Sequence, residues 1–218
     1  MIALDQVCPA PLEASLTKKS AEEEKSEIWQ QEIKLDAGKK IQLNAPSGKG
    51  KSTFVHLLYG IRQDYQGEIH WKGKNLKQLS AKEWVQIRQY EMSIVFQDLR
   101  LFSHLTALEN IQVKSVLYDE DKTLEIKELA NQMGILPLMD KKAAFLSYGE
   151  KQRVAIIRAL IQPFELLLLD EPFSHLDEEN IRVICSLMEE KCAQQSAGLL
   201  MTSLGYPYYI HFDQKLIL

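Results

Sequence analysis

Residues 40–60 read KIQLNAPSGKGKSTFVHLLYG: an apolar strand-like run, a loop of small residues and an apolar helix. The loop APSGKGKS at 45–52 fits the pattern G-x-x-x-x-G-K-[S/T] except at its first position, where Ala45 stands for glycine. Such a loop turns successive N–H groups toward an anion at a helix N-terminus, where the helix dipole also favours negative charge. The stretch predicts phosphate binding, although taken alone it also fits a turn that only caps a helix.

The start of that helix supplies two side chains with distinct expected roles. Lys51 would reach the β- and γ-phosphates of a nucleotide, and the Ser52 hydroxyl would bind Mg²⁺. The residues predicted here to bind the nucleotide are Ala45, Pro46, Ser47, Gly48, Lys49, Gly50, Lys51, Ser52 and Thr53.

A second group of candidate residues follows the apolar run LLLLDEP at 166–172, which ends in two carboxylates. Asp170 would hold the Mg²⁺, usually through water, and Glu171 would orient or deprotonate the attacking water. Alone, an acidic pair at a strand end can also be a solvated turn or a helix N-cap. Paired with the phosphate loop on a neighbouring strand, it predicts a nucleotide triphosphatase with Glu171 as the catalytic residue.

Short apolar runs alternate with longer helical patterns along the chain. The predicted strands lie at 41–43, 93–96, 165–170 and 198–202, and the predicted helices start at Gly50 and Glu150 and lie near 178–192. This alternation is typical of a mainly parallel sheet covered by helices, so the fold class is α/β. The section 98–162 carries helical patterns without a strand between them, which predicts a helical subdomain inserted into the α/β core.

The segment LSYGEKQRVAIIRAL at 146–160 resembles the signature of ATP-binding-cassette (ABC) proteins, with Tyr148 and Glu150 where Gly and Gln are more frequent. The family's order of motifs is reproduced across nearly the whole chain: phosphate loop, Gln97 after SIVF, signature, LLLLDE, then SHLD at 174–177. Five motifs in this order are far more specific than any one of them. The chain looks most like the lipoprotein-release, macrolide-export and cell-division branch of that family.

The resemblance implies a P-loop NTPase core with a mainly parallel sheet, a small antiparallel β region and the helical subdomain. The core would comprise 1–97 and 163–218, and the subdomain with the signature 98–162, as one ATPase domain. It also implies a homodimer, or a pair with another ABC subunit, that encloses two ATP molecules with Mg²⁺. The pair would drive an integral membrane permease from the cytoplasmic face of the membrane.

The resemblance also assigns roles to the remaining motifs. The nucleotide of the opposite subunit would be contacted by Ser147, Tyr148, Gly149 and Glu150. Ser147 and the Gly149 N–H start a helix and can therefore bind a γ-phosphate. Ser147 and Glu150 also fit a capping box, and both roles can hold at once. Asp177 would cross the dimer interface. Gln97 would bind at the ATP site, sense Mg²⁺ and report to the permease, so the expected magnesium ligands are Ser52, Gln97 and Asp170.

The segment DLRLFSHLTALEN at 98–110 places several apolar side chains beside Gln97: Leu99, Leu101, Phe102 and Leu105. In the family this region lines a groove for the coupling helix of the permease, so the partner is expected to bind through 97–110. The core of the helical subdomain is the alternative place for the same side chains.

Three features of the sequence depart from the family pattern. After GLLMT the family presents a histidine that contacts the γ-phosphate, whereas Ser203 stands at this switch position and His211 follows eight residues later. No aromatic residue for adenine stacking occurs in VCPAPLEASL at 7–16, and we expect the nearest one, Trp29, to be core. Ala45 adds a methyl group, which costs little only where φ is below zero. Together these changes predict slow or weak use of nucleotide.

Composition sets further limits on function. A net charge of −4 provides no global positive field, so nucleic acid is not an expected partner. Cys8, Cys185 and Cys192 have no metal-type spacing and are expected to be reduced, buried residues. No apolar stretch is long enough to span a bilayer, and the charged run KKSAEEEK at 18–25 predicts an exposed loop or short solvated helix.

Two functions follow as hypotheses. The first is a transport ATPase whose dimer closes on ATP and reopens after hydrolysis. The alternative is a slow or degenerate ATPase that acts as a regulatory or force-transmitting subunit without carrying a solute, which the missing histidine favours. Cargo is not encoded in the chain under either hypothesis, because in this family the permease selects it.

Overall fold

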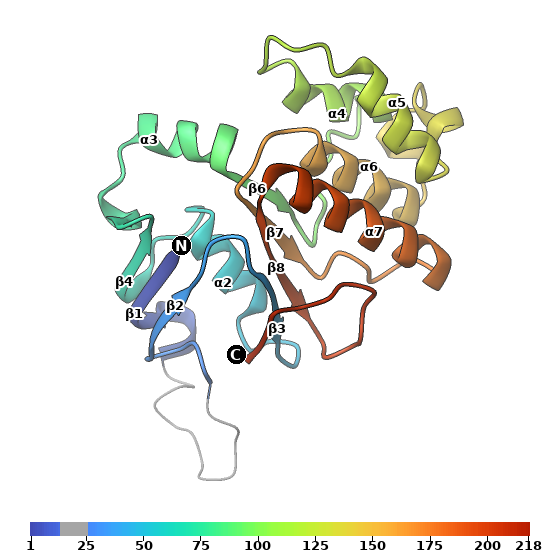
Figure 1. The fold of residues 1–218 in the computed structure, drawn as a ribbon. Coiled ribbons are helices and arrows are strands. Elements are labelled where there is room, and N and C mark those ends of the chain that lie inside the picture. The colour runs from blue at the N-terminus through green and yellow to red at the C-terminus, as the bar shows by residue number, and fades with distance from the viewer. Residues whose placement is uncertain (14–25) are drawn as a thin grey trace.

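The computed structural model describes residues 1–13 and 26–218, so the charged run at 18–25 lies outside the described residues. The larger sheet is parallel throughout, in the order β6-β7-β8-β3-β9 (Figure 1). Its strands are β3 (Lys40–Asn44), β6 (Met92–Val95), β7 (Leu166–Asp170), β8 (Gly198–Ser203) and β9 (Gln214–Ile217). Four of them confirm the predicted runs. The sequence did not predict β9, a mostly exposed edge strand whose residues QKLI lack a continuous apolar run.

A smaller antiparallel sheet in the order β2-β1-β4-β5 confirms the expected small antiparallel region. Its strands are β1 (Ile2–Pro9), β2 (Glu32–Leu35), β4 (Tyr65–Trp71) and β5 (Lys74–Asn75). The register of β1 against β4 shifts between Asp5 and Cys8, as at a β-bulge. The end of β1 continues into a short 3₁₀ helix, η1 (Ala10–Leu12), beside the phosphate loop.

Both faces of the parallel sheet are buried, as parallel sheets require. Alternate residues of β7 enter two different cores. Leu166 and Leu168 belong to the core shared with the antiparallel sheet and α2 (Lys51–Leu58). Leu167 and Leu169 belong to the core shared with the helices that follow β6. The sheet is therefore held from both sides, which fixes the loops at the carboxyl ends of its strands.

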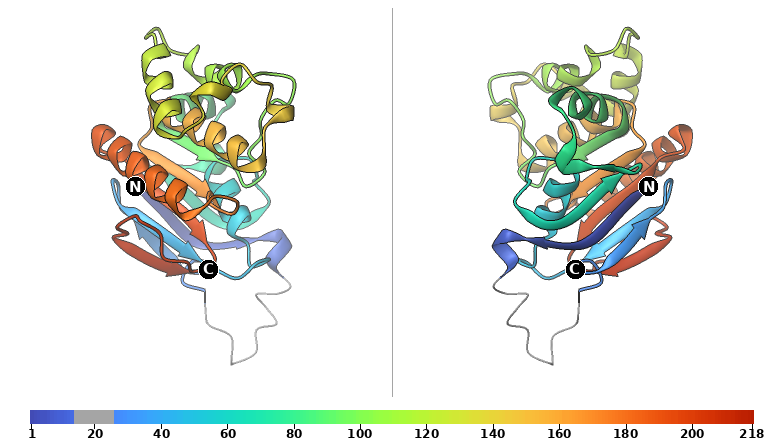
Figure 2. Two further views of the ribbon diagram at one scale, coloured as in Figure 1. Left: turned by 90° about the vertical axis from the view of Figure 1, so that its right-hand side faces the viewer. Right: turned by 90° about the vertical axis from the view of Figure 1, so that its left-hand side faces the viewer.

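The remaining helices are α3 (Ala81–Gln86), α4 (Ala107–Ser115), α5 (Thr123–Gln132), α6 (Tyr148–Leu160) and α7 (Glu178–Gln195), with a π-helical segment η3 (Ile87–Glu91) after α3. Short 3₁₀ turns are η2 (Leu76–Gln78), η4 (Leu136–Leu138) and η5 (Ala143–Phe145). Figure 2 shows α4, α5 and α6 grouped at one end of the molecule and the antiparallel strands toward the other. The section 98–162 is thus helical, without a strand, as predicted.

The start of α6 is a correction to the predicted boundary at Glu150. The helix begins at Tyr148 because Ser147 is its N-cap and forms a reciprocal capping box with Glu150.

Two other expectations concern the cysteines and membrane-spanning helices. Cys8, Cys185 and Cys192 are buried free thiols, as predicted. In residues 1–13 and 26–218, no helix combines the length and the apolar character needed to cross a membrane.

Candidate nucleotide site

The phosphate loop lies between β3 and α2, as the sequence predicted. Gly50 is the N-cap of α2 with φ of +99°, a left-handed conformation that favours glycine. A Cβ at Gly50 would also lie 2.5 Å from Leu12 Cδ1 and 3.3 Å from Trp29 Cζ2. Trp29 itself is buried and packs edge-on against Phe54, so its prediction as a core residue is confirmed. The core thus supports the loop directly from beneath.

Lys51 is held at the centre of the loop with only 5% of its side chain exposed. Its ammonium donates to the Ala45 carbonyl at 2.6 Å and the Pro46 carbonyl at 3.1 Å, and lies 3.0 Å from Glu171 Oε1. These contacts point the charge along the inside of the loop, toward the position where phosphates would sit. The ion pair also brings the two predicted key residues, Lys51 and Glu171, together across the site.

Ala45 fits its position without backbone strain. Its φ is not among the positive values in the chain, so the extra methyl group meets the condition under which it costs little. Its N–H donates to the Ser203 carbonyl at 3.2 Å, which ties the loop to the end of β8. Ala45 is therefore no reason for weak phosphate binding.

Asp170, at the end of β7, is almost fully buried. Burial raises the pKa of its carboxyl group, an effect opposed by the nearby hydroxyls of Ser52 and Thr202. Thr202 Oγ1 donates to Asp170 Oδ1 at 2.9 Å. Among the residues that the structure describes, nothing donates to the buried Oδ2. Thr202 thus engages Oδ1 of Asp170, and Oδ2 remains available to a ligand.

Glu171 adopts a left-handed backbone conformation, with φ of +47°. Such a conformation is strained for a residue with a side chain and persists only where its surroundings hold it. Here the Glu171 N–H donates to Thr202 Oγ1 at 3.0 Å, and the carboxylate pairs with Lys51. The turn aims the carboxylate into the site instead of along the strand.

A pocket of about 420 Å³ opens over the phosphate loop and Glu171. Its lining consists of Pro11, Leu12, Ser47, Gly48, Gly50, Lys51, Ser52, Thr53, Gln97 and Glu171. The first two residues come from η1 and are aliphatic, in the place where the sequence lacked an aromatic platform for a base. Ser52 Oγ donates to Gln97 Oε1 at 3.2 Å, which joins α2 to the segment that follows β6. The pocket thus brings together six of the predicted loop residues, Gln97 and Glu171, whereas Ala45, Pro46, Lys49 and Asp170 do not line it. Asp170 lies beside Ser52.

The signature lies elsewhere on the surface, at the start of α6. Ser147 accepts from the Glu150 N–H, and the Glu150 carboxylate accepts from the Ser147 N–H at 2.7 Å, which lowers the pKa of Glu150. A Cβ at Gly149 would lie 3.2 Å from the His175 carbonyl, so the close packing of α6 against the 174–177 loop needs a small residue there. In the described chain, none of residues 147–150 lines the pocket over the phosphate loop.

Tyr148 has contacts that the sequence did not predict. Its hydroxyl donates to the Gln97 carbonyl at 2.8 Å, and its ring lies 4.1 Å from that of His175, centroid to centroid. The tyrosine therefore links the signature to the Gln97 loop and to the 174–177 loop within one chain. Glycine at this position could make neither contact.

Asp177 and Ser203 have local partners in the structure. Asp177 is the N-cap of α7 and accepts from the Asn180 N–H at 2.8 Å, which lowers the pKa of its carboxyl group. Ser203, with 1% of its surface exposed, accepts from the Gly205 N–H at 3.0 Å. The backbone N–H of His211 donates to Glu189 of α7 at 3.3 Å. In the described chain, neither Ser203 nor His211 lines the pocket over the phosphate loop.

Thr202 is the site residue that sequence reasoning missed. The parallel register pairs it with Asp170, so its hydroxyl reaches both acidic residues of the neighbouring strand. A usable signal was present, because residues at the ends of adjacent parallel strands meet at the same edge.

Comparisons with known proteins agree with this geometry. The profile of the family described as ABC transporter matches residues 30–174. The lipoprotein-releasing system ATP-binding protein LolD of Legionella pneumophila is 32% identical over 190 residues, which cover 86% of this chain and 84% of that protein. The thiamine import ATP-binding protein ThiQ of Vibrio parahaemolyticus is 32% identical over 180 residues, which cover 81% of this chain and 74% of that protein.

A solved structure extends the comparison to the whole fold. The dimeric post-hydrolysis state of the ATP-binding cassette MJ0796, bound to ADP and Pi, has a TM-score of 0.75 at 25% identity and covers 93% of this chain and 88% of that chain. Profile, relatives and fold all agree with the order of motifs and with the arrangement of loop and carboxylates. The chain therefore belongs to the ABC transporter family, as one of its ATP-binding cassettes.

Proposed function

We propose that this chain is the ATP-binding and ATP-hydrolysing subunit of an ABC transporter, and that two cassettes close around two ATP molecules to drive a membrane permease. The observation that carries the proposal is the convergence of Lys51, Glu171 and Asp170 on the phosphate loop. LolD is named as the ATP-binding protein of a lipoprotein-releasing system and ThiQ as that of thiamine import, and MJ0796 was solved as a dimer.

Mg²⁺ is the expected metal at this site. The candidate ligands are Ser52 Oγ, Gln97 Oε1 and Asp170 Oδ2, and hard oxygen donors of this kind suit a small divalent cation. The unpartnered Asp170 Oδ2 supports the assignment, since a buried acceptor without a donor is costly unless a ligand satisfies it. When bound, the ion would neutralise charge on the β- and γ-phosphate oxygens.

The ion pair between Lys51 and Glu171 suggests how nucleotide prepares the catalytic base. The γ-phosphate would take over Lys51 as its cation, and Glu171 would lose its present partner. The carboxylate is then free to orient the attacking water and to accept its proton. Its strained backbone, anchored by Thr202, keeps that carboxylate aimed into the pocket.

The position of the signature supports a site completed in trans. The helix N-terminus at Ser147 and Gly149 can bind a phosphate, but it does not line its own chain's pocket in the described residues. A second cassette in head-to-tail orientation would supply that phosphate, with Tyr148 and Glu150 at the same surface. Asp177, at the adjoining loop, would lie at the interface and couple the two sites.

Domain division and location follow from the same proposal. The segments 1–97 and 163–218 would form the ATP-binding core, and 98–162 the helical subdomain that moves with the permease. The permease would bind at 97–110 and hold the cassette at the cytoplasmic face of the membrane.

The direct test is ATP-dependent dimerisation of Glu171→Gln. The variant keeps the shape of the site but lacks the carboxylate that would accept a proton, so ATP should persist and the dimer should accumulate. We expect a dimer by light scattering with Mg-ATP and a monomer with Mg-ADP. Lys51→Ala in the same background should remain monomeric. A Glu171→Gln chain that stays monomeric at saturating Mg-ATP would contradict the proposal.

Ser203 favours the second candidate function, a slow ATPase in a regulatory or force-transmitting subunit. A buried serine hydroxyl that is already engaged by the Gly205 N–H supplies no cationic contact to a γ-phosphate. Restoring such a contact with Ser203→His should raise kcat by up to about 100-fold, measured as phosphate release, with Ser203→Ala as the control. An unchanged kcat in a folded Ser203→His protein would remove this argument for the alternative.

A further inference from the structure

Tyr148, the first residue of α6, contacts two segments that lie far from it in the sequence. Its hydroxyl donates to the Gln97 carbonyl at 2.8 Å, and its ring centroid lies 4.1 Å from that of His175. The residue before it, Ser147, is the N-cap of the helix that is proposed to bind the partner's nucleotide. Tyr148 therefore joins the start of α6 to the segment after β6 and to the 174–177 loop.

Gln97 is bonded through its side chain as well as through its main chain. Its Oε1 accepts from Ser52 Oγ at 3.2 Å, and Ser52 lies in the first turn of α2. Both of these oxygens are proposed magnesium ligands. Two hydrogen bonds thus lead from the proposed magnesium position through Gln97 to Tyr148. A change of partner at Gln97 Oε1 can therefore reach the start of α6 through a single residue.

The segment after Gln97 is bonded to α6 a second time, at the other end of the helix. Leu99 and Arg100 have φ of +59° and +45°, a left-handed conformation that is strained for residues with side chains. Arg158, a buried residue in the last turn of α6, donates to the Leu99 carbonyl at 2.6 Å and to the Arg100 carbonyl at 2.7 Å. Both ends of α6 therefore hold this segment, and we expect the segment and the helix to move together.

The ring of Tyr148 packs against the loop that precedes α7. His175 Nδ1 lies 2.9 Å from Ser174 Oγ, so the imidazole has a second neighbour within that loop. A Cβ at Gly149 would lie 3.2 Å from the His175 carbonyl, which shows how closely α6 approaches the loop. The loop ends at Asp177, the N-cap of α7, which is proposed to lie at the dimer interface. A movement of α6 would therefore reach both surfaces that are proposed to meet the second cassette.

We propose that Tyr148 is a positioning residue that couples the two nucleotide sites of the dimer. Gln97 changes its side-chain partner when Mg-nucleotide binds in its own pocket, and the Tyr148 hydroxyl transmits this change to the helix N-terminus that meets the opposite nucleotide. Such coupling is reciprocal, so occupation of either site favours the bound position of the other. The inference rests on the proposed function and adds a path between its two sites. Glycine has neither the hydroxyl nor the ring, so the path depends on the tyrosine of this chain.

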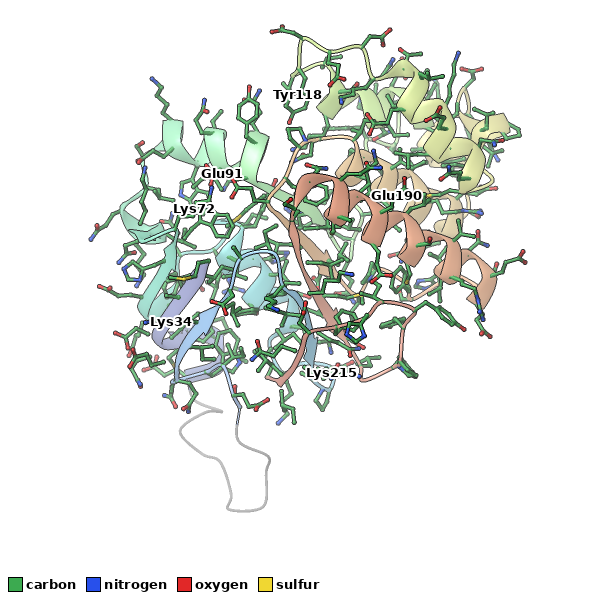
Figure 3. The ribbon with its side chains drawn as sticks, in the orientation of Figure 1. Lys34, Lys72, Glu91, Tyr118, Glu190 and Lys215 are labelled. Atoms are coloured by element: carbon green, nitrogen blue, oxygen red, sulfur yellow. The ribbon has the colours of Figure 1, made fainter. Side chains whose placement is uncertain are left out.

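The first test measures transmission inside one chain by hydrogen exchange and mass spectrometry, with Mg-ADP as the ligand and light scattering to verify that the protein is a monomer. Peptides covering 45–52 and 146–153 should both exchange more slowly with Mg-ADP, the second by roughly threefold or more. Tyr148→Phe keeps the ring on His175, and it should abolish only the response at 146–153. Tyr118→Phe is the matched control, because this tyrosine, labelled beside α4 in Figure 3, also donates to a main-chain carbonyl and should leave both responses intact.

The second test asks whether Tyr148 acts through Gln97. In the Glu171→Gln background, Tyr148→Phe should raise the dimer dissociation constant with Mg-ATP by roughly tenfold, because one hydrogen bond is lost in each chain. Combined with Gln97→Ala, the same substitution should raise this constant by less than about twofold, because the path is already broken. A direct contact of the Tyr148 hydroxyl with the partner's nucleotide would instead give the same factor in both backgrounds.

Three outcomes would overturn the inference alone: a response at 146–153 that survives Tyr148→Phe, a wild-type chain that responds at 45–52 but not at 146–153, or equal factors in the two backgrounds of the second test. Two others would overturn the proposed function itself. These are a wild-type phosphate loop that does not respond to Mg-ADP, and a Glu171→Gln chain that stays monomeric with Mg-ATP.

Discussion

The Thr202 hydroxyl contacts both acidic residues of the site, since it donates to Asp170 and accepts from the Glu171 N–H. Thr202→Val keeps the branched shape but leaves a buried carboxylate oxygen and a backbone N–H without partners. We expect the free energy of unfolding to fall by about 1–3 kcal/mol, and kcat to fall because Glu171 is no longer held. Urea denaturation and phosphate release measure the two effects. Thr202→Ser retains the oxygen and should be close to wild type, and equal losses in both variants would refute this role.

Lys114 should make the free energy of unfolding of the isolated chain depend on pH. The folded chain holds the Lys114 proton less tightly than the unfolded chain does. Burial, followed by the charges of Arg158 and Arg88, lowers the pKa of Lys114 from 10.5 to about 8. This contribution destabilises the isolated chain below pH 8 and disappears as the pH rises from 8 to 10.5. Lys114→Met should therefore gain about 1 kcal/mol of stability at pH 7, allowing for solvent screening, and should lose that advantage at high pH. Denaturant titrations of both proteins at the two pH values check it, and a constant difference would argue against the cause.

At the scale of the helix, two equal caps separate stability from function. Ser147 on α6 and Thr106 on α4 both form capping boxes with a glutamate three residues on. Ser147→Ala and Thr106→Ala should each cost about 1 kcal/mol of stability. In the Glu171→Gln background only Ser147→Ala should impair ATP-dependent dimerisation, because only the α6 N-terminus is proposed to meet a nucleotide. Similar dimerisation of the two variants by light scattering would reduce Ser147 to a structural cap.

Elements with strong local signals were predictable from sequence. The strand–loop–helix at 40–60 and the apolar run of β7 have patterns that fix both their type and their neighbours. The edge strand β9 was not predictable, since a mostly exposed strand of four residues has little periodicity and depends on pairing with β3. The contacts of Tyr148 and Thr202 escaped for a related reason, because they join segments distant in sequence and arise only from the packed fold.

The whole molecule separates two features that one reaction needs. The pocket with Lys51 and Glu171 lies at the phosphate loop, and the helix N-terminus at Ser147 lies outside its lining in the described chain. The phosphate loop is anchored in one hydrophobic core and α6 in the other, so each feature is held by packed side chains. A closed assembly of two chains is the simplest way to bring both features to one nucleotide.

Complementation between two inactive chains tests this assembly. Lys51→Ala removes the phosphate-binding cation, and Ser147→Arg blocks the helix N-terminus, so neither homodimer should hydrolyse ATP. A mixed dimer places both defects at one site and leaves the other site intact. With random pairing and independent sites, an equimolar mixture should recover roughly one quarter of wild-type kcat. Phosphate release from the mixture and from each variant alone measures it, with both substitutions in a single chain as the control. A mixture as inactive as its components would show that two copies of this chain do not complete each other's sites.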